Sequence, residues 1–415
     1  LYFTKKNFLK FIFNCNNSGK DKYINPLLWQ FGHVIFFYIK YVLDNLNNCN
    51  NINIINKKEL INFYDSYKTP KKYRNCNLLL SYTECIIYYN DIISILEKYL
   101  KHEKITNVEC YLIMLGILHN EMHNEAFIFT RINLGIKINY FEFNNNNNNN
   151  NILEKDIKFI DVNPGLFIQG SNNNINNLIF DNEMPHFIKK INKFQISKYN
   201  ITEYQFLQFI KNNCYYNKKL WSIEGLRWLI ETKIELPLYW IKEDNNYYKI
   251  INGIKYSIET DLPIINISYY EADAYCNWKN GRLPTESEYE YITTNMGTTI
   301  YPWGNKKIND EYCNINYKKY ISSVSEYKKG NNKLGISNLL GNIWEWCSDF
   351  IYPYDGFKID PVYREMSYPY FGFKKICKGG SFAVPDFLIH PKYRNSQYPD
   401  CRIQFIGFRV CRDLI

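Results

Sequence analysis

The stretch Gly341-Asn-Ile-Trp-Glu-Trp346 places one carboxylate between two tryptophans, shortly after a glycine. Glycine adopts positive φ angles without steric cost and lets the backbone make close contacts. Large aromatic side chains bury much apolar area wherever the chain turns back on itself. We therefore expect an aromatic-packed turn in which Trp344 and Trp346 flank Glu345.

The sequence around this stretch, over residues 158–415, has the same character. Gly, Pro and Trp are frequent, and short β-rich segments recur. Apolar residues at helical spacing stand out at 202–211 and at 269–280. This mixture predicts an α+β fold with much irregular structure.

The first part of the chain, residues 1–143, follows a different pattern. Apolar residues recur at helical spacing over three stretches, 26–43, 81–100 and 108–134. Long helical patterns joined by polar loops predict a helix bundle. Eight consecutive asparagines, Asn144–Asn151, follow this part, and such a tract cannot bury apolar area. The expected organisation is a helical domain over 1–143, an Asn-rich linker over 144–157 and an α+β domain over 158–415.

Length, charge and hydropathy restrict the class of protein. The chain has 415 residues, which predicts two or three domains. The chain has 50 Lys and Arg residues against 41 Asp and Glu residues, which gives a net charge of +9. These charges are spread along the chain without a run of like charges, so no nucleic-acid partner is expected. No uncharged apolar stretch reaches the ~18 residues that a membrane span requires, so no membrane partner is expected.

Cysteine usage predicts a reducing, cytoplasmic environment. Twelve cysteines are scattered along the chain without a CxxC pair, which indicates neither a zinc ribbon nor a disulfide framework. The chain begins Leu1-Tyr2-Phe3 rather than with Met, which indicates a fragment or a processed form.

Three of the six histidines form a candidate metal site. His119 and His123, in LHNEMHNEAF, are four residues apart, so both rings lie on one helix face, a spacing that suits joint binding of one metal ion. His33, in LWQFGHVIFF, could face the same interior point from an earlier helix. Three neutral imidazoles leave open positions on a metal for substrate and O2, and Glu125 could orient one of the histidines.

Two other interpretations compete with this one. A histidine on an apolar face is more often a hydrogen-bonded core residue, and the spacing does not name the metal. A zinc peptidase is disfavoured because its HExxH motif needs Glu directly after the first histidine, where this chain has Asn120.

Seven motifs in the second part of the chain follow one another in a specific order. They are Phe180-Asp-Asn-Glu-Met-Pro-His186, Asn266-Ile-Ser-Tyr-Tyr-Glu-Ala-Asp-Ala-Tyr275, Gly281-Arg-Leu-Pro-Thr-Glu-Ser-Glu-Tyr289, Tyr301-Pro-Trp-Gly304, Gly341-Asn-Ile-Trp-Glu-Trp346, Gly379-Gly-Ser-Phe382 and Gly407-Phe-Arg409. Their order and spacing resemble the formylglycine-generating-enzyme (sulfatase-modifying-factor) fold, a C-type-lectin-like α+β domain, from about 158 to 412. Formylglycine-generating enzymes carry reactive cysteines after the GGS motif, and none lies between Ala383 and Arg394, so copper–thiolate chemistry is not expected.

The first part of the chain decides between branches of this family. WQFGH and HxxxHxE, placed ahead of such a domain, resemble the DinB-like helix bundle of the ergothioneine/ovothiol sulfoxide synthases. The resemblance implies that His33, His119 and His123 bind a non-haem Fe(II). It also implies that O2 is used to couple a thiol to a histidine-derived imidazole and to form a sulfoxide. The segments 352–357, 363–365 and 390–395 are similar to these synthases as well.

The resemblance also assigns roles to individual side chains. Tyr354 corresponds to a tyrosine that donates a proton, and Asn395 to a position that touches the imidazole substrate. Arg74 resembles an arginine that holds a substrate carboxylate, the alternative being an exposed surface cation. The small-molecule partners implied are a histidine derivative, a thiol and O2.

Several positions depart from the best-known members of the family. Met122 stands where a glutamine contacts the imidazole, as in members similar to selenoneine synthases. Gln397 and Cys401 occupy positions of an acid and a base that grip γ-glutamylcysteine, with Asp400 and Arg402 nearby as further candidates for substrate binding. Selenium transfer and a non-catalytic, lectin-like binding protein therefore remain as alternatives, and the oligomeric state stays open.

Overall fold

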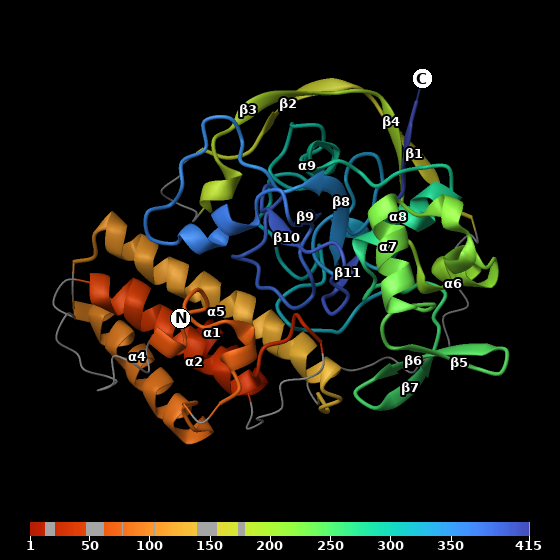
Figure 1. Cartoon of the computed structure of the whole chain (residues 1–415). Coiled ribbons are helices and arrows are strands. Elements are labelled where there is room, and N and C mark those ends of the chain that lie inside the picture. The colour runs from red at the N-terminus through yellow and green to blue at the C-terminus, as the bar shows by residue number, and fades with distance from the viewer. Residues whose placement is uncertain are drawn as a thin grey trace. The chain divides into compact units, whose positions relative to one another are not determined.

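The structure is a computed structural model of the chain that describes residues 1–12, 21–46, 62–76, 78–102, 104–138, 156–172 and 179–414 (Figure 1). The asparagine tract and most of the expected linker lie outside the described residues. The chain divides into two compact units. The helical unit is Leu1–Ile138, and the mixed unit contains the described residues 156–172 and 179–414.

Long α-helices build the helical unit. They are α1 (Tyr2–Phe11), α2 (Leu27–Phe37), α4 (Tyr82–His102) and α5 (Asn107–Asn133). Helix α2 continues directly into a π-helical turn, η1 (Tyr38–Val42), and a 3-10 turn, η2 (Leu43–Asn45); a further 3-10 turn, η3, spans Lys71–Tyr73. The three helices predicted from apolar spacing are confirmed as α2 with η1, α4 and α5.

Capping side chains set where the longest helix begins. The Thr106 hydroxyl accepts the backbone N–H of Glu109, and the Glu109 carboxylate accepts the backbone N–H of Thr106 at 2.9 Å. The same carboxylate accepts the Tyr99 hydroxyl at 2.6 Å, which ties the start of α5 to the end of α4. A cap of this kind stabilises a helix by about 1 kcal/mol.

Helix α1 was not predicted from the sequence. Its lysines interrupt the apolar pattern, and its helical state depends on packing. Phe8 is fully buried, stacks on Tyr89 at 4.1 Å between ring centroids, and contacts Phe31 and Phe127 edge-on. The helix therefore completes the core of the helical unit.

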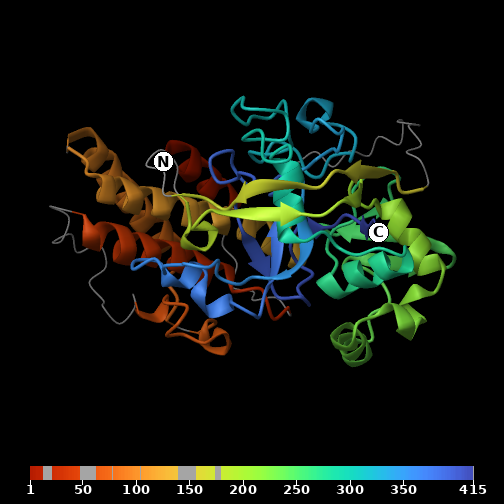
Figure 2. The same cartoon turned by 90° about the horizontal axis from the view of Figure 1, so that it is seen from above.

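The mixed unit combines small sheets with short helices, as predicted (Figures 1 and 2). Its four-stranded sheet has the order β10 (Asn395–Gln397), β9 (Lys375–Lys378), β8 (Trp344–Phe350), β11 (Ile406–Gly407), with only β8 and β11 parallel. A second sheet has the order β1 (Phe159–Val162), β4 (Phe194–Ser197), β12 (Cys411–Asp413). The remaining strands form the hairpin β2 (Gly165–Gln169) with β3 (Phe187–Ile191), and the meander β5 (Trp240–Glu243), β6 (Asn246–Ile251), β7 (Ile254–Ser257).

Four α-helices pack around these sheets: α6 (Glu203–Lys211), α7 (Ile223–Thr232), α8 (Tyr269–Trp278) and α9 (Glu286–Thr293). Helices α6 and α8 confirm the two predicted patterns, whereas α7 and α9 were not predicted. The described residues of this unit also form six 3-10 turns: Asp181–Glu183, Cys214–Tyr216, Lys218–Leu220, Lys328–Gly330, Arg364–Met366 and Tyr368–Tyr370. Within the described residues, no helix has both the length and the hydropathy that crossing a membrane requires.

The predicted turn at Trp344–Trp346 is wrong. The turn comes earlier, at Gly341 and Asn342, whose φ angles are +74° and +69°. A side chain at position 341 would lie 2.6 Å from the carbonyl oxygen of Asn314, so only glycine fits. Trp344 then begins β8, a strand that pairs with a neighbouring strand on each edge. The first residues of β8 are buried on both faces of the sheet, so apolar residues are not confined to one face there.

A buried ion pair connects this strand to the end of the chain. The Arg409 guanidinium lies 2.8 Å from the Glu345 carboxylate, and both side chains are fully buried. Tyr289 of α9 donates its hydroxyl to Glu345 at 2.9 Å. Arg409 also donates to the backbone carbonyls of Lys198 and Asn338, each at 3.0 Å. One ion pair thus joins a strand, a helix and two loops.

This pair should dominate the stability of the mixed unit. Glu345→Gln leaves the Arg409 charge buried without its counter-charge, and breaking such a pair costs about 3–5 kcal/mol. The free energy of unfolding, measured by urea denaturation, should fall by that amount. Glu243→Gln is the matched control, because its ion pair with Lys255 is about half exposed, and should change stability little. Equal stability of the two variants would contradict this account.

Candidate metal centre

His33, His119 and His123 come together inside the helical unit. One ring nitrogen from each lies within 4.8 Å of the others. The ring centroids are 5.1 Å apart for His33 with either partner and 4.6 Å apart for His119 and His123. The predicted convergence of α2 and α5 on one interior point is therefore present; the role of the three side chains as metal ligands stays a prediction.

Tyr64 fixes the orientation of His33. Its backbone carbonyl oxygen lies 2.8 Å from His33 Nδ1, and because a carbonyl only accepts, Nδ1 carries the proton. The lone pair is then on Nε2. Gly32 permits this contact, since a Cβ there would lie 2.1 Å from the Tyr64 ring. The glycine of the WQFGH motif therefore makes room for the residue that holds the histidine.

All three imidazoles are neutral at pH 7. Burial lowers the pKa of His33 to about 4, against the opposing effect of the Tyr64 hydrogen bond. Burial lowers the pKa of His119 and His123 well below the ordinary value, and neighbouring histidines add to the shift. Neutral imidazole is the form that binds metal ions.

The donor set fits a divalent transition metal. His123 Nδ1 is buried and has no hydrogen-bond partner among the described residues, an arrangement that is costly unless something binds there. Imidazole nitrogens suit Fe, Zn, Cu and Ni. Fe(II) is compatible with this set, and three protein ligands would leave positions free for substrates.

The other two predicted residues of the helical unit lie in well-defined surroundings. Glu125 is buried on α5, the helix that carries His119 and His123. Arg74 is half-buried rather than an exposed cation. Its guanidinium lies 4.0 Å above the Trp29 ring and donates to the carbonyls of Thr69 and Ser66 at 2.9 Å. Trp29 in turn stacks on His33 with ring centroids 5.1 Å apart.

Tyr354, the predicted proton donor, lies in the mixed unit. Its hydroxyl donates to Glu286 at 3.1 Å and accepts from Gln169 at 3.2 Å. The Arg394 guanidinium covers its ring at 4.0 Å. Burial, followed by the negative charge of Glu286, raises the pKa of Tyr354 well above its ordinary value, so the hydroxyl keeps its proton at neutral pH.

The predicted substrate-binding residues near β10 differ in how many hydrogen bonds and ion pairs they make with the rest of the chain. Asn395 and Gln397 lie on β10, and the Asn395 side-chain oxygen accepts the backbone N–H of Ser396. Arg402 is 3.1 Å from Glu271, which caps α8, and also donates to the Leu236 carbonyl. Its charge is therefore neutralised internally. Asp400 is partly exposed in the loop after β10.

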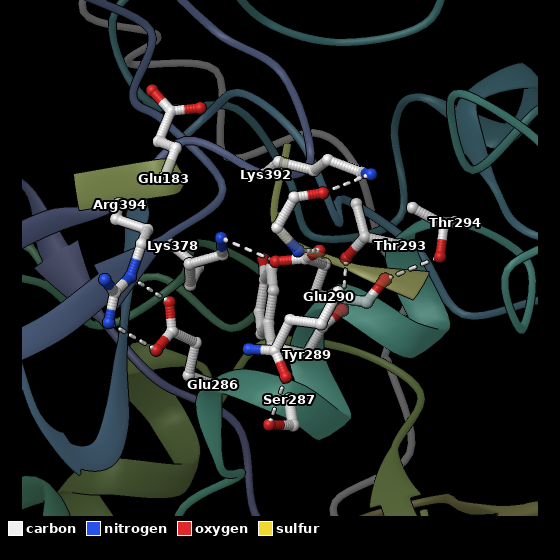
Figure 3. A network of polar contacts seen from close by, with 12 residues as sticks. Glu183, Glu286, Ser287, Tyr289, Glu290, Thr293, Thr294, Lys378, Lys392 and Arg394 are labelled. Atoms are coloured by element: carbon white, nitrogen blue, oxygen red, sulfur yellow. Dashed lines mark hydrogen bonds and ion pairs between the residues drawn. The ribbon is translucent and has the colours of Figure 1, made fainter. Parts of the chain in front are cut away.

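Sequence reasoning missed a buried charge network in the mixed unit (Figure 3). Arg394 grips Glu286 through two hydrogen bonds of 2.6 and 2.9 Å. Lys378, fully buried at the end of β9, points toward Glu290, with 3.5 Å between Nζ and Oε2. The one available signal was the spacing of Glu286 and Glu290, which places two carboxylates on the same face of α9.

Glu183 and His390 form a neutral pair at the edge of this network. Burial raises the pKa of Glu183 to about 8 and lowers that of His390 to about 3, so at pH 7 the carboxyl keeps its proton and the imidazole is uncharged. The carboxyl Oε2 lies 3.2 Å from His390 Nε2. The two groups therefore lie beside each other without opposite charges.

The chain belongs to the family with a sulfatase-modifying factor enzyme 1-like domain, whose model matches residues 146–414. The resemblance predicted from the seven motifs is confirmed. The chain is also 30% identical over 240 residues to a hercynine oxygenase from Mycobacterium tuberculosis. That stretch covers 56% of each protein, so the chain spans about half the length of the hercynine oxygenases it matches.

The same comparison finds formylglycine-generating enzymes. The chain is 27% identical over 272 residues to the one from Thermomonospora curvata, covering 56% of this chain and 86% of the relative. It is 25% identical over 289 residues to the one from Mus musculus, covering 62% of this chain and 75% of the relative. Both groups of relatives are enzymes. The family match begins at residue 146, so the three histidines lie outside it.

Metal binding can be measured directly. Prepared without oxygen, the chain should bind about one equivalent of Fe(II) or Co(II). His123→Ala should abolish stoichiometric binding, because two imidazoles bind a divalent ion far more weakly than three. His186→Ala is the matched control, since His186 is exposed and lies in the mixed unit. Stoichiometric metal in a His33/His119/His123 triple alanine variant would refute the assignment.

The Glu183–His390 pair predicts a pH-dependent stability. A carboxyl whose pKa is higher in the folded chain than in the unfolded chain makes the free energy of unfolding fall as pH rises. For Glu183 this fall should extend from about pH 4.5, the ordinary pKa, to about pH 8, the pKa in the folded chain. His390, with its lowered pKa, opposes this fall up to about pH 6.5. Between pH 6.5 and 8 the wild type should therefore lose stability relative to Glu183→Gln, by at most about 1.4 kcal/mol per pH unit. Parallel curves from urea denaturation would contradict the raised pKa of Glu183.

Proposed function

We propose that the protein is an O2-dependent, non-haem Fe(II) enzyme that joins a thiol to a histidine-derived imidazole and forms a sulfoxide. The observation that carries the proposal is the convergence of His33, His119 and His123 in a chain related to hercynine oxygenases. We further propose that the helical unit is a DinB-like bundle and that the domains are 1–143, a linker over 144–157, and 158–415.

The overall change balances without a further oxidant. A thiol R–SH and an imidazole C–H lose their two hydrogens, a C–S bond forms, and sulfur gains one oxygen atom. The second oxygen atom leaves with those hydrogens as water. O2 accepts four electrons, two from C–S bond formation and two from oxidation of sulfur to the sulfoxide.

The three histidines would hold the iron in this proposal. Bound Fe(II) would supply the thiolate affinity and the redox chemistry with O2 that imidazoles alone lack. The protein keeps the histidines in their neutral, metal-binding form through burial. Tyr64 keeps the Nε2 lone pair of His33 available by occupying Nδ1. Glu125 is proposed to orient a histidine from its buried position on α5.

Tyr354 is the proposed proton donor. Its high pKa keeps the hydroxyl protonated at neutral pH, as a general acid requires. Gln169 and Glu286 hold the hydroxyl in one orientation from two sides. Arg394 stabilises the negative charge of Glu286, so this carboxylate does not remove the proton.

Substrate binding is proposed for the remaining predicted residues. Asn395 is proposed to donate an amide N–H to a substrate, while its side-chain oxygen accepts from the backbone N–H of Ser396. Arg74, whose planar guanidinium can bind a carboxylate with two hydrogen bonds, is proposed to hold a substrate carboxylate beside Trp29. Met122 contributes a weakly polar thioether, which cannot hold a ring nitrogen strongly.

The test is turnover with hercynine or histidine after anaerobic reconstitution with Fe(II), using product mass as the readout. Competing cysteine and γ-glutamylcysteine at equal concentration tests the donor. Gln397 and Cys401 offer no charge pair to a γ-glutamyl group, and Arg402 is paired with Glu271. If γ-glutamylcysteine lacks one charge-assisted hydrogen bond to its γ-glutamyl group, its binding is weakened by ~1.5–3 kcal/mol. Cysteine should therefore be preferred over γ-glutamylcysteine by roughly 10- to 150-fold.

Three outcomes would change this proposal. Dominance of the γ-glutamyl product would return Asp400 and Arg402 to the role of substrate clamp. A product containing selenium from a selenol donor, with none from thiols, would make the chain a selenium-transferring relative. Binding of small molecules without iron or turnover would make it a non-catalytic binding protein.

A further inference from the structure

Helix α2 changes its helical form close to the histidines. After Phe37 the backbone widens into the π-helical turn η1, Tyr38–Val42. Such turns are rare and often lie at functional sites. The five residues of η1 include neither Gly nor Pro, so no local helix breaker accounts for it. Its contacts with the rest of the helical unit must explain why this turn is stable.

The first contact fixes the plane of His119. Phe37, the last residue before the turn, stacks on His119 with ring centroids 3.6 Å apart and an angle of 7° between the planes. Both side chains are buried. The imidazole cannot rotate out of this plane without colliding with the phenyl ring, so Phe37 sets the direction in which the His119 nitrogens point.

The second contact sets how closely the turn approaches α5. A Cβ at Gly116 would lie 2.7 Å from the Tyr38 ring and 2.8 Å from a Val42 methyl group, so α5 can pass η1 only because residue 116 is glycine. The Tyr38 hydroxyl donates to Asn120 at 3.4 Å. Gly116 and Asn120 lie on either side of His119 in the sequence of α5. The turn η1 therefore contacts α5 in the same helical turns that carry His119.

The third contact reaches His33. Lys40, in the middle of the turn, pairs with Asp65 at 3.2 Å, and the Asp65 side chain is buried. Asp65 follows Tyr64, whose carbonyl accepts from His33 Nδ1. The Lys40–Asp65 pair therefore ties η1 to the segment that orients the second histidine.

We propose that η1 is the positioning element of the metal centre. Phe37 is the positioning residue for His119, and the Lys40–Asp65 pair is its counterpart for His33. A regular α-helical turn here would rotate the residues that follow Phe37 by about 100° per residue removed, which would separate the contacts of Tyr38 and Val42 with α5 and of Lys40 with Asp65. The inference rests on the proposed metal-binding function and concerns the geometry of the three imidazoles.

The test compares Phe37→Leu with Phe11→Leu in the full chain, using Co(II) as the probe. Both variants remove a buried phenyl ring from the helical unit, so both should lose stability, but Phe11 lies at the end of α1, a helix that carries none of the three histidines. Phe37→Leu should weaken Co(II) binding about 10-fold, the lower end of what loss of an orienting neighbour costs. It should also shift the visible absorption bands of the bound Co(II), whereas Phe11→Leu should change neither readout.

Lys40→Gln provides a second variant that is expected to fold, since the Lys40 side chain is 38% exposed. It should weaken Co(II) binding about two- to fivefold, as expected for a partly exposed pair. Wild-type affinity and spectra in both Phe37→Leu and Lys40→Gln would overturn the inference while leaving the metal centre in place. Failure of the wild type itself to bind Co(II) would overturn both proposals.

Discussion

The buried ion pair between Glu345 and Arg409 is the interaction on which the mixed unit depends. Neither charge has access to water, so each is tolerable only while the other is present. Because Tyr289 and the carbonyls of Lys198 and Asn338 complete the hydrogen bonding, the pair can form only when β8, α9 and two distant loops have reached their final positions. The charges therefore favour one arrangement of a unit that has little regular structure.

The helical unit also has ionisable side chains in its interior, but these are neutral. Three imidazoles lie among aromatic rings, and desolvation lowers their pKa values far enough that none carries a charge at pH 7. Tyr64, Phe37 and Trp29 hold the rings by a hydrogen bond and by stacking rather than by ion pairs. An interior of this kind carries no net charge and already has imidazole lone pairs available for a metal ion.

Local patterns predicted the parts of the structure that follow from local physics. Apolar spacing identified α2, α4 and α5, and the i, i+4 spacing of His119 and His123 placed both rings on one face. The partnership with His33 needed the resemblance to a known family as well. The β8 strand was taken for a turn, because a Trp-Glu-Trp segment buried on both faces has no alternation to reveal it.

Contacts between distant segments could not be predicted in this way. The Arg394–Glu286 pair joins residues 108 positions apart, and nothing in either local sequence requires the other. Lys378 resembles any strand-end lysine until the fold buries it completely. The π-helical turn is a similar case, since its sequence contains no Gly or Pro to mark it, and the residues that it contacts, Gly116 and Asp65, lie elsewhere in the chain.

The location of the histidines in the helical unit has a consequence for the assignment of function across related genomes. All three come from residues before 146, where the match to the family model begins. A search with that model alone would group proteins by a shared scaffold and not by the side chains that could bind metal. Sorting the matches by whether a histidine and an HxxxH pair precede the domain would separate candidate iron enzymes from members that share only the scaffold.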